Sequence, residues 1–268
     1  MTNREPTLSA ARARLATVLR ASKDVISIET VTKALALNRT VAAKLLSRWS
    51  HQGWLRRVGS GLYVQVPLDL AGNEQIVEDP WVLIPTLFGQ SYVGGWTAAH
   101  HWELTEQLFN EIVIFSARRV DKKRVIAQGA TFILRHISGK HFFGLMTLWR
   151  GETRVQVSDP ARTIVDMIAM PDMGGGIDHV ADCLAAYTRQ PGYDGDQLLR
   201  YAEQFANGAV FKRLGFLAEA HLKNEALVVA CRARLTSGYA RLDPALRAGV
   251  LVTAWRLWVP QRWKKRRM

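Results

Sequence analysis

Residues 38–53 read NRTVAAKLLSRWSHQG and have the pattern of one amphipathic helix. Asn38 is a residue type that caps the start of a helix, and Gly53 is the type that most often follows the end of one. The apolar residues between them are spaced three and four apart, so they share one face of the helix. These residues are Ala42, Leu45, Leu46 and Trp49. We therefore predict a helix from 39 to 52 that packs this face against neighbouring helices.

The opposite face of this predicted helix carries polar and cationic side chains. Such side chains bond to base edges and phosphates when a helix lies in the major groove of DNA, and the first turn of a helix offers N–H groups to a phosphate. The alternative is a surface helix whose charges only face water. The residues of this face that we predict to contact DNA are Arg39, Thr40, Lys44, Ser47, Arg48 and His51.

The sequence on either side of this helix predicts further elements, in the order found in a class of DNA-binding domain. Two helices are predicted before it, one from about Leu8 to Ala21 and one capped by Ser27 that runs to Leu35. After it, two β-rich runs at 54–58 and 62–66 flank a glycine turn, which predicts a hairpin. Two helices, a turn, a third helix and a hairpin form the order of a winged helix-turn-helix. On the hairpin, we predict DNA contacts from Arg56, Arg57 and Ser60.

The net charge of the 268-residue chain is +13, and it is concentrated at the two ends. Residues 1–66 hold 11 Lys and Arg against 3 Asp and Glu, and residues 232–268 hold 10 against Asp243 alone. The middle of the chain, residues 67–231, holds 15 Lys and Arg against 19 Asp and Glu. Two basic ends around a mildly acidic body predict two surfaces that meet a polyanion.

Composition indicates a globular protein of one or two domains, because 48% of the residues are hydrophobic. The two cysteines, Cys183 and Cys231, are too few and too far apart for a disulfide framework or a cysteine-rich zinc site, which fits a reducing cytosol. The N-terminus lacks the apolar core of a secretory signal, and the uncharged stretch 80–102 contains Pro, Gly and His that a lipid-facing helix tolerates badly. We expect a cytoplasmic protein with no membrane contact and no cofactor.

Beyond a polar connection at 67–79, the pattern changes to short strands and then to helices. The predicted strands lie at 111–115, 131–137, 142–148 and 154–157, with a helix between 97 and 104. The predicted helices lie at 160–170, 177–188, 194–206, 210–222 and 224–235. The predicted fold class is therefore α+β: an N-terminal winged helix-turn-helix at 1–70, then a mixed α/β C-terminal domain at 80–240 with a small antiparallel-rich sheet and a helical end.

The last segment, 241–268, is a basic tail in which Trp255, Trp258 and Trp263 alternate with cations. It has three interpretations. A basic arm with stacking aromatics suits nucleic acid, a positive segment suits an acidic partner such as a protein, and a short charge run often forms a solvated, disordered end. In the first interpretation, the residues that make accessory nucleic-acid contacts are Arg262, Lys264, Lys265, Arg266 and Arg267.

Four runs of the second domain occur together in a distinctive order: YVGGWTAAHHW at 92–102, VSDPARTIVD at 157–166, GGGI at 174–177 and RLGFLAE at 213–219. Behind a winged helix, they resemble the AbiEi family of antitoxins from abortive-infection toxin–antitoxin systems, over about residues 10–225. The most distinctive marker is the Asp-Pro-x-Arg-Thr-x-x-Asp run. The chain departs from the family at Val93-Gly94, where Ser-Gly is usual, and at His101, which replaces an apolar-Gly step.

The resemblance implies two tasks and no enzymatic activity. Members of the family repress their own operon by binding inverted-repeat operator DNA through the N-terminal domain, which suggests cooperative binding of two copies. Their C-terminal domain counters a toxin that resembles a nucleotidyltransferase. Two alternatives from other classes remain: a solo winged-helix regulator with a ligand-sensing second domain, and a DNA-tethered enzyme that modifies a partner protein.

The marker run itself is predicted to be structural. Asp159 suits an N-cap, Pro160 suits the first helical position, and Arg162 lies one turn before Asp166 and can pair with it. Gly174 to Gly176 follow a proline and not a strand, so a turn is favoured over a phosphate loop.

No catalytic constellation stands out elsewhere. His100, His101, His136 and His141 are predicted to pack in the core, because no cysteine or carboxylate lies at metal-ligand spacing. Cys183 and Cys231 are predicted to be helical and buried, with no histidine near them in sequence to activate a nucleophile. Asp194 and Asp196 are one residue apart, as in a paired-carboxylate site, but helix capping explains them.

Overall fold

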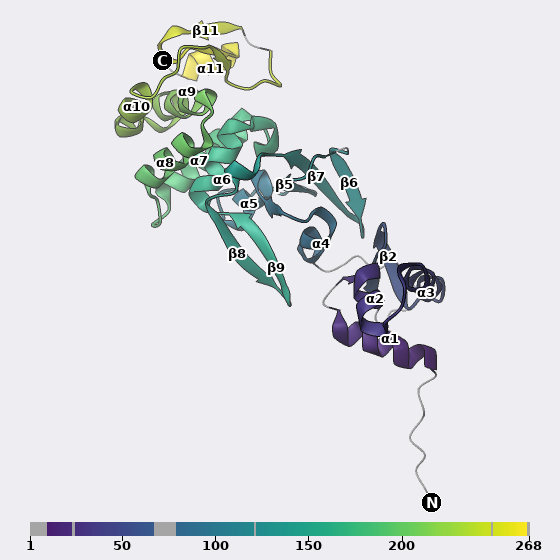
Figure 1. Ribbon diagram of the computed structural model, residues 1–268. Coiled ribbons are helices and arrows are strands. Elements are labelled where there is room, and N and C mark those ends of the chain that lie inside the picture. The colour runs from purple at the N-terminus through teal and green to yellow at the C-terminus, as the bar shows by residue number, and fades with distance from the viewer. Residues whose placement is uncertain (1–9, 23–24, 67–78, 121, 248, 267–268) are drawn as a thin grey trace, which may run out of the picture. The chain divides into compact units, whose positions relative to one another are not determined.

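The computed structural model describes residues 10–22, 25–66, 79–120, 122–247 and 249–266 (Figure 1). Contacts divide the chain into two compact units. The first comprises residues 1–89 together with 126–130 and 148–155, and the second comprises 90–125, 131–147 and 156–268. Among the residues described, no helix is both long enough and apolar enough to cross a lipid bilayer.

The first unit begins with three helices, and a hairpin follows them. A short strand before the second helix joins the hairpin, so the sheet has the order β1-β3-β2, with antiparallel pairing throughout. The sequence patterns did not predict this strand, because two residues are too few to show an alternation. The elements are α1 (Ala10–Ala21), β1 (Ile26–Ser27), α2 (Ile28–Leu35), α3 (Arg39–His51), β2 (Leu55–Gly59) and β3 (Leu62–Gln65).

Side-chain caps fix where two of these helices begin. The Ser27 hydroxyl accepts a hydrogen bond from the backbone N–H of Thr30 at 3.0 Å, and the Asn38 side chain accepts one from the N–H of Val41 at 2.9 Å. Gly53 has a φ of +74° just beyond the end of α3, which is the left-handed conformation that glycine adopts without strain. The three predicted helix boundaries are confirmed.

The predicted apolar face of α3 is confirmed as well. Ala42, Leu46 and Trp49 are each at most 1% exposed, and Leu45 is partly buried against the same cluster. The cluster is completed by apolar side chains from the other elements of this unit: Val18, Ile26, Val31, Leu55 and Tyr63. The face that carries Trp49 therefore cannot rotate outward without opening this core.

The predicted domain boundary at 67–79 lies outside the described residues, except for Asp79. This residue caps a short 3-10 helix, η2 (Pro80–Leu83), by accepting a hydrogen bond from the N–H of Trp81 at 3.0 Å. The helix α4 (Ile84–Phe88) follows directly.

A six-stranded mixed sheet lies at the beginning of the second unit, and the tips of its two outer hairpins belong to the first. Its order is β6-β7-β5-β4-β9-β8; β5 pairs in parallel with β7, β4 pairs in parallel with β9, and β4 and β5 are antiparallel. The prediction of a small antiparallel-rich sheet missed both parallel pairings and the strands β4 and β6. The strands are β4 (Ser91–Val93), β5 (Glu111–Ser116), β6 (Arg124–Ala127), β7 (Ala130–His136), β8 (Leu145–Arg150) and β9 (Thr153–Ser158).

Helices predicted after residue 160 are confirmed, and they pack around the first of them, α6. Every residue of α6 from Ala161 to Ala169 is buried. Helices α5, α7, α8 and α9 all contact it. The helices are α5 (Gly95–His101), α6 (Pro160–Ala169), α7 (Ile177–Arg189), α8 (Gly195–Phe205), α9 (Gly208–Leu217) and α10 (Glu225–Arg232), with a 3-10 turn η4 (Pro171–Gly174) and a π-turn η5 (Ala218–Leu222).

The described residues after α10 form ordered elements and pack on the helices before them. The last described residues form a second small sheet of order β10-β12-β11, which lies over α9 and α10 in yellow in Figure 1. Trp255 and Trp263 are fully buried, and the Trp255 indole N–H donates to Glu219 at 2.8 Å. These two tryptophans are core residues, so the interpretation of the tail as an arm with stacking aromatics does not apply to them. The elements are β10 (Ala240–Arg241), β11 (Val250–Val252), η6 (Thr253–Trp255), β12 (Leu257–Val259) and α11 (Gln261–Arg266).

The cap at Asn38 gives a test of the first unit. We expect Asn38→Ala to lower the free energy of unfolding by about 1 kcal/mol, because the N–H of Val41 loses its acceptor. Urea denaturation followed by circular dichroism measures this change. The control is Gln52→Ala, which alters an exposed side chain at the other end of α3 and should change stability by less than about 0.5 kcal/mol. Equal effects of the two substitutions would contradict the capping role.

Candidate nucleic-acid interface

The face of α3 opposite its buried side is open to solvent. Of the six residues predicted to contact DNA from this helix, Ser47 is partly buried and the other five, Arg39, Thr40, Lys44, Arg48 and His51, are exposed. At about 100° per residue, Thr40, Lys44, Ser47 and His51 fall in one stripe opposite the buried face, and Arg39 and Arg48 flank that stripe. Ring atom Nδ1 of His51 lies 2.7 Å from the Ser47 carbonyl oxygen, one turn earlier.

The start of α3 adds backbone donors to this face. The side chain of Asn38 accepts a hydrogen bond from the N–H of Val41, and the backbone N–H of Ala42 donates to the Asn38 carbonyl at 3.0 Å. The amides of Arg39 and Thr40 precede this first bond of the helix, so they have no intrahelical acceptor. Together with the positive end of the helix dipole, such amides favour a phosphate.

The hairpin places its three predicted residues in different environments. Arg57 is exposed, and its Nε donates to the Gly59 carbonyl at 3.1 Å across a β-bulge. Ser60 is exposed at the turn. Gly61 closes the turn with a φ of +71°, and a Cβ there would lie 2.7 Å from the side chain of Ile28. Arg56 is partly buried and donates from Nη1 to the side-chain oxygen of Gln128 at 3.3 Å.

Residues 25–66, which carry α3 and the hairpin, hold few acidic side chains. Glu29 is the one acidic residue between positions 25 and 66. It pairs with Lys33 at 2.9 Å, and the hydrogen bond from that lysine lowers the pKa of the Glu29 carboxyl. The cations of α3 and the hairpin therefore have no acidic neighbour within residues 25–66 other than this paired carboxylate.

Of the C-terminal cations predicted as accessory nucleic-acid contacts, Arg262 is paired with a carboxylate. Arg262 forms an ion pair with Asp178 of α7. Lys264, Lys265 and Arg266 belong to α11, but their side chains lie outside the described residues, as does Arg267 altogether. Nothing in the structure tests their predicted role.

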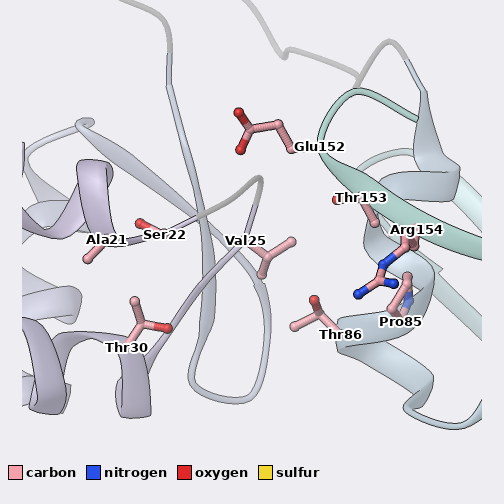
Figure 2. Close-up of a pocket in the computed structure, with 9 residues that line it drawn as sticks. All are labelled: Ala21, Ser22, Val25, Thr30, Pro85, Thr86, Glu152, Thr153 and Arg154. Atoms are coloured by element: carbon pink, nitrogen blue, oxygen red, sulfur yellow. The ribbon is translucent and has the colours of Figure 1, made fainter. Parts of the chain in front are cut away.

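A hollow of about 390 Å³ lies in the first unit (Figure 2). Most of its lining consists of small, apolar or hydroxyl side chains; the two charged side chains are Glu152 and Arg154. The complete lining is Ala21, Ser22, Val25, Thr30, Pro85, Thr86, Glu152, Thr153 and Arg154.

The distinctive run of the second unit forms a closed polar cluster. Arg162 pairs with Asp166 at 2.9 Å, as predicted, and both side chains have no exposed surface. The Tyr92 hydroxyl donates to Asp166 at 2.9 Å and lies 3.1 Å from the Arg162 guanidinium, whose face is covered by Phe143 at 4.0 Å. Burial raises the pKa of Tyr92 well above its usual value, so this hydroxyl keeps its proton. The cluster joins β4 to α6, and its Arg162 and Asp166 side chains are closed off from solvent.

Asp159, the N-cap of α6, is the partly exposed end of this cluster. Its carboxylate accepts from the N–H of Arg162 at 2.8 Å and from the Tyr201 hydroxyl at 2.8 Å. Burial is the largest influence on this group and raises the pKa of the Asp159 carboxyl above its ordinary value of 3.8. The predicted cap is confirmed, and so is the turn at Gly174–Gly176, where Gly175 has a left-handed φ of +78°.

A cysteine–histidine contact was missed in the sequence. His179 lies four residues before Cys183 on α7, and its Nε2 is 3.5 Å from the sulfur. The same ring also contacts the Gly174 carbonyl at 2.7 Å and the Thr105 hydroxyl at 2.9 Å. The statement that no histidine lies near Cys183 is therefore wrong, and the i, i+4 spacing was the available signal. Burial raises the pKa of Cys183 to about 12, so the group is a thiol at neutral pH and a poor nucleophile.

The remaining histidines differ from prediction. His100 and His136 are exposed, so their predicted core packing is wrong. His101 and His141 are partly buried and contact the rings of Trp102 and Phe205. Within the described part of the chain, no three His, Cys, Asp or Glu side chains are grouped as a metal site.

Comparison with known proteins adds information on the fold. No protein-family model and no curated protein sequence matches the chain. A solved structure aligns with 95% of this chain and 93% of its own, with a TM-score of 0.59 and 15% sequence identity. The chain shares its fold with the RV2827C protein from Mycobacterium tuberculosis. At this identity the likeness concerns the mixed α+β fold of the two proteins and does not extend to individual residues.

The raised pKa of Asp159 predicts a pH dependence of stability. The folded state binds this proton more tightly than the unfolded state, so the contribution is complete below pH 3.8 and is lost as pH rises through the folded-state pKa. Wild type should therefore lose stability relative to Asp159→Asn as pH rises from 3.8 toward neutrality. Thermal melts of both proteins across this range measure the difference.

The matched control for this experiment is Asp194→Asn. Asp194 caps α8 in the same way, by accepting from the N–H of Gln197 at 2.8 Å, but in an exposed position. The Asp194→Asn variant measures the change in stability when an exposed capping charge is lost. The difference between this change and that of Asp159→Asn isolates the effect of burial. If both variants follow wild type in parallel at every pH, burial of Asp159 has no influence on stability.

Proposed function

We propose that this protein is a sequence-specific DNA-binding repressor whose N-terminal domain, residues 1–70, is a winged helix-turn-helix. The two-sided character of α3 carries the proposal. Ala42, Leu46 and Trp49 are held in the core, and the opposite stripe presents Lys44 and its neighbours to solvent. A helix with these faces, followed by a basic hairpin, suits the major groove of duplex DNA.

In this proposal, α3 is the recognition helix. From Thr40 to His51 the stripe rises roughly 16 Å, at 1.5 Å per residue, which corresponds to about five base pairs. Lys44 and Arg48 are assigned to base edges, where one good bidentate contact is worth about 1–3 kcal/mol of discrimination. Arg57 and Ser60 on the hairpin are assigned to the phosphate backbone, and Arg56 serves partly to hold the hairpin through Gln128.

We further propose, on the resemblance to AbiEi antitoxins, that the regulated operon is the protein's own and that residues 80–240 counter a nucleotidyltransferase-like toxin. Two copies would occupy an inverted repeat. The closed cluster of Arg162 and Asp166 supports a structural role for the marker run, and therefore a non-enzymatic second domain without a cofactor.

Salt dependence tests the DNA interface. With five or six phosphate contacts, the logarithm of the association constant for the upstream region of the operon should fall against the logarithm of salt concentration with a slope of about −5. Bandshift titrations from low to moderate salt measure the slope. Binding that is independent of salt would overturn the interface.

Substitutions separate the roles of the two surfaces in the same assay. Arg48→Ala should change the preferred sequence, whereas Arg57→Ala should weaken binding to all sequences alike. Arg189→Ala, at an exposed position of α7, is the control and should leave binding unchanged. Identical footprints for Arg48→Ala and Arg57→Ala would show that the assignment of roles is wrong.

Coexpression tests the antitoxin proposal. The product of the adjacent reading frame should arrest growth when expressed alone, and this protein should restore growth. The double variant Lys44→Ala/Arg48→Ala should restore growth as well as wild type from an independent promoter, because neutralisation is assigned to residues 80–240. An adjacent product that is harmless, or that stays toxic beside this protein, would leave a solo repressor as the function.

A further inference from the structure

The small C-terminal sheet has one face in the core and one face in solvent. Leu257 and Val259 of β12 are fully buried, and Trp258 between them points the other way with 43% of its surface exposed. Such alternation follows from the two-residue period of a strand. The outward face of this sheet is therefore centred on an exposed tryptophan.

The neighbouring strands add a cation and an aliphatic side chain beside Trp258. In the strand register, Arg241 of β10 and Leu251 of β11 are the residues opposite Trp258. Adjacent strands are roughly 4.8 Å apart, so the three side chains form one row across the sheet. Arg241 is exposed, and Tyr239, just before β10, is 63% exposed. We refer to Tyr239, Arg241, Leu251 and Trp258 as the outer row.

The segment that carries the outer row is rich in cations, of which Arg232, Arg234 and Arg262 pair with carboxylates of other segments. Residues 232–268 contain ten Lys and Arg, and their single acidic residue is Asp243. Asp243 is 3% exposed and directed inward, because its carboxylate accepts from the backbone N–H groups of Ile177 and Ala245. Among the described residues, no carboxylate pairs with Arg241. A positive surface without an exposed acid from its own segment complements a polyanion.

We propose that the outer row binds single-stranded nucleic acid, with a base stacked on Trp258 and a flanking phosphate at Arg241. An exposed aromatic ring on a basic sheet is the arrangement by which proteins hold unpaired bases without reading their sequence. Duplex DNA presents no free base face to such a ring. This site is separate from α3 and does not depend on the repressor proposal.

The test is fluorescence anisotropy of a labelled twelve-nucleotide oligothymidylate titrated with the full chain. Stacking of one base contributes about 1–3 kcal/mol, so Trp258→Ala should raise the dissociation constant at least about fivefold. Trp258→Phe should retain most of the affinity, because it keeps an aromatic face. Arg241→Ala should reduce the salt slope by about 0.7, the value for one phosphate contact of a single strand.

Three controls make the outcome decisive. Trp149→Ala removes a tryptophan that is 63% exposed on another sheet and should leave oligonucleotide binding unchanged. Lys44→Glu/Arg48→Glu should abolish operator binding and leave oligothymidylate binding within twofold, so failure of one proposal is distinguishable from failure of the other. The proposal is overturned if Trp258→Ala binds as wild type does, if Trp149→Ala is equally impaired, or if a duplex of the same length competes as well as the single strand.

Discussion

The burial of Trp49 with Leu46 and Ala42 fixes the rotation of α3 about its own axis, and the arrangement of the N-terminal unit depends on it. A helix turned by half a revolution would place Lys44 and His51 in an apolar core, where an unpaired charge costs several kcal/mol. It would also expose the tryptophan. The caps at Ser27 and Asn38 fix where the helices begin, so the polar stripe has a defined starting point as well as a defined direction. The surface that we propose for DNA is thus determined by the packing behind it.

In the second unit, the other helices pack around α6 as the N-terminal core packs against α3. Unlike α3, α6 is buried on all sides. Because every residue from Ala161 to Ala169 is buried, the charged pair on this helix must be satisfied internally. Asp166 is satisfied by Arg162 and by the Tyr92 hydroxyl, which comes from a strand 74 residues away. A buried ion pair of this kind adds little net stability, but it becomes costly when either partner is lost. It therefore specifies how α6 sits against β4 and leaves little tolerance at these positions.

Much of the fold could be predicted from local patterns, and what was missed has physical reasons. Helices with an apolar face and a capping residue, such as α3 and α6, show their boundaries in the sequence. The strands β1 and β4 are too short to show an alternation. The strand predicted at 142–148 begins later, at Leu145, because Phe142 turns its ring to Tyr92 and does not join the sheet.

Some features of the candidate site could likewise be predicted from local patterns, and others could not. Exposure of Arg39, Lys44 and Arg48 follows from helical spacing alone, so the sequence was sufficient for α3. The contact between Arg56 and Gln128 joins residues 72 positions apart, and no local pattern signals it. In the C-terminal segment, the density of Lys and Arg hid the alternation of Leu257, Trp258 and Val259. That alternation places Trp258 outward, whereas Trp255 in η6 and Trp263 in α11 are buried and do not belong to the strand.

The polar groups inside the second domain differ in their surroundings from those of an acid–base site. A general acid or base must lie within hydrogen-bond reach of its substrate. The polar groups inside this domain are instead engaged in holding the backbone: the Arg213 guanidinium donates to the carbonyls of Ile168 and Ala169 at the end of α6, and Asp243 caps the start of α7. Cys183 is buried as a thiol. The exposed cations Lys44 and Arg241, by contrast, lie at the surface, and both binding proposals depend on them.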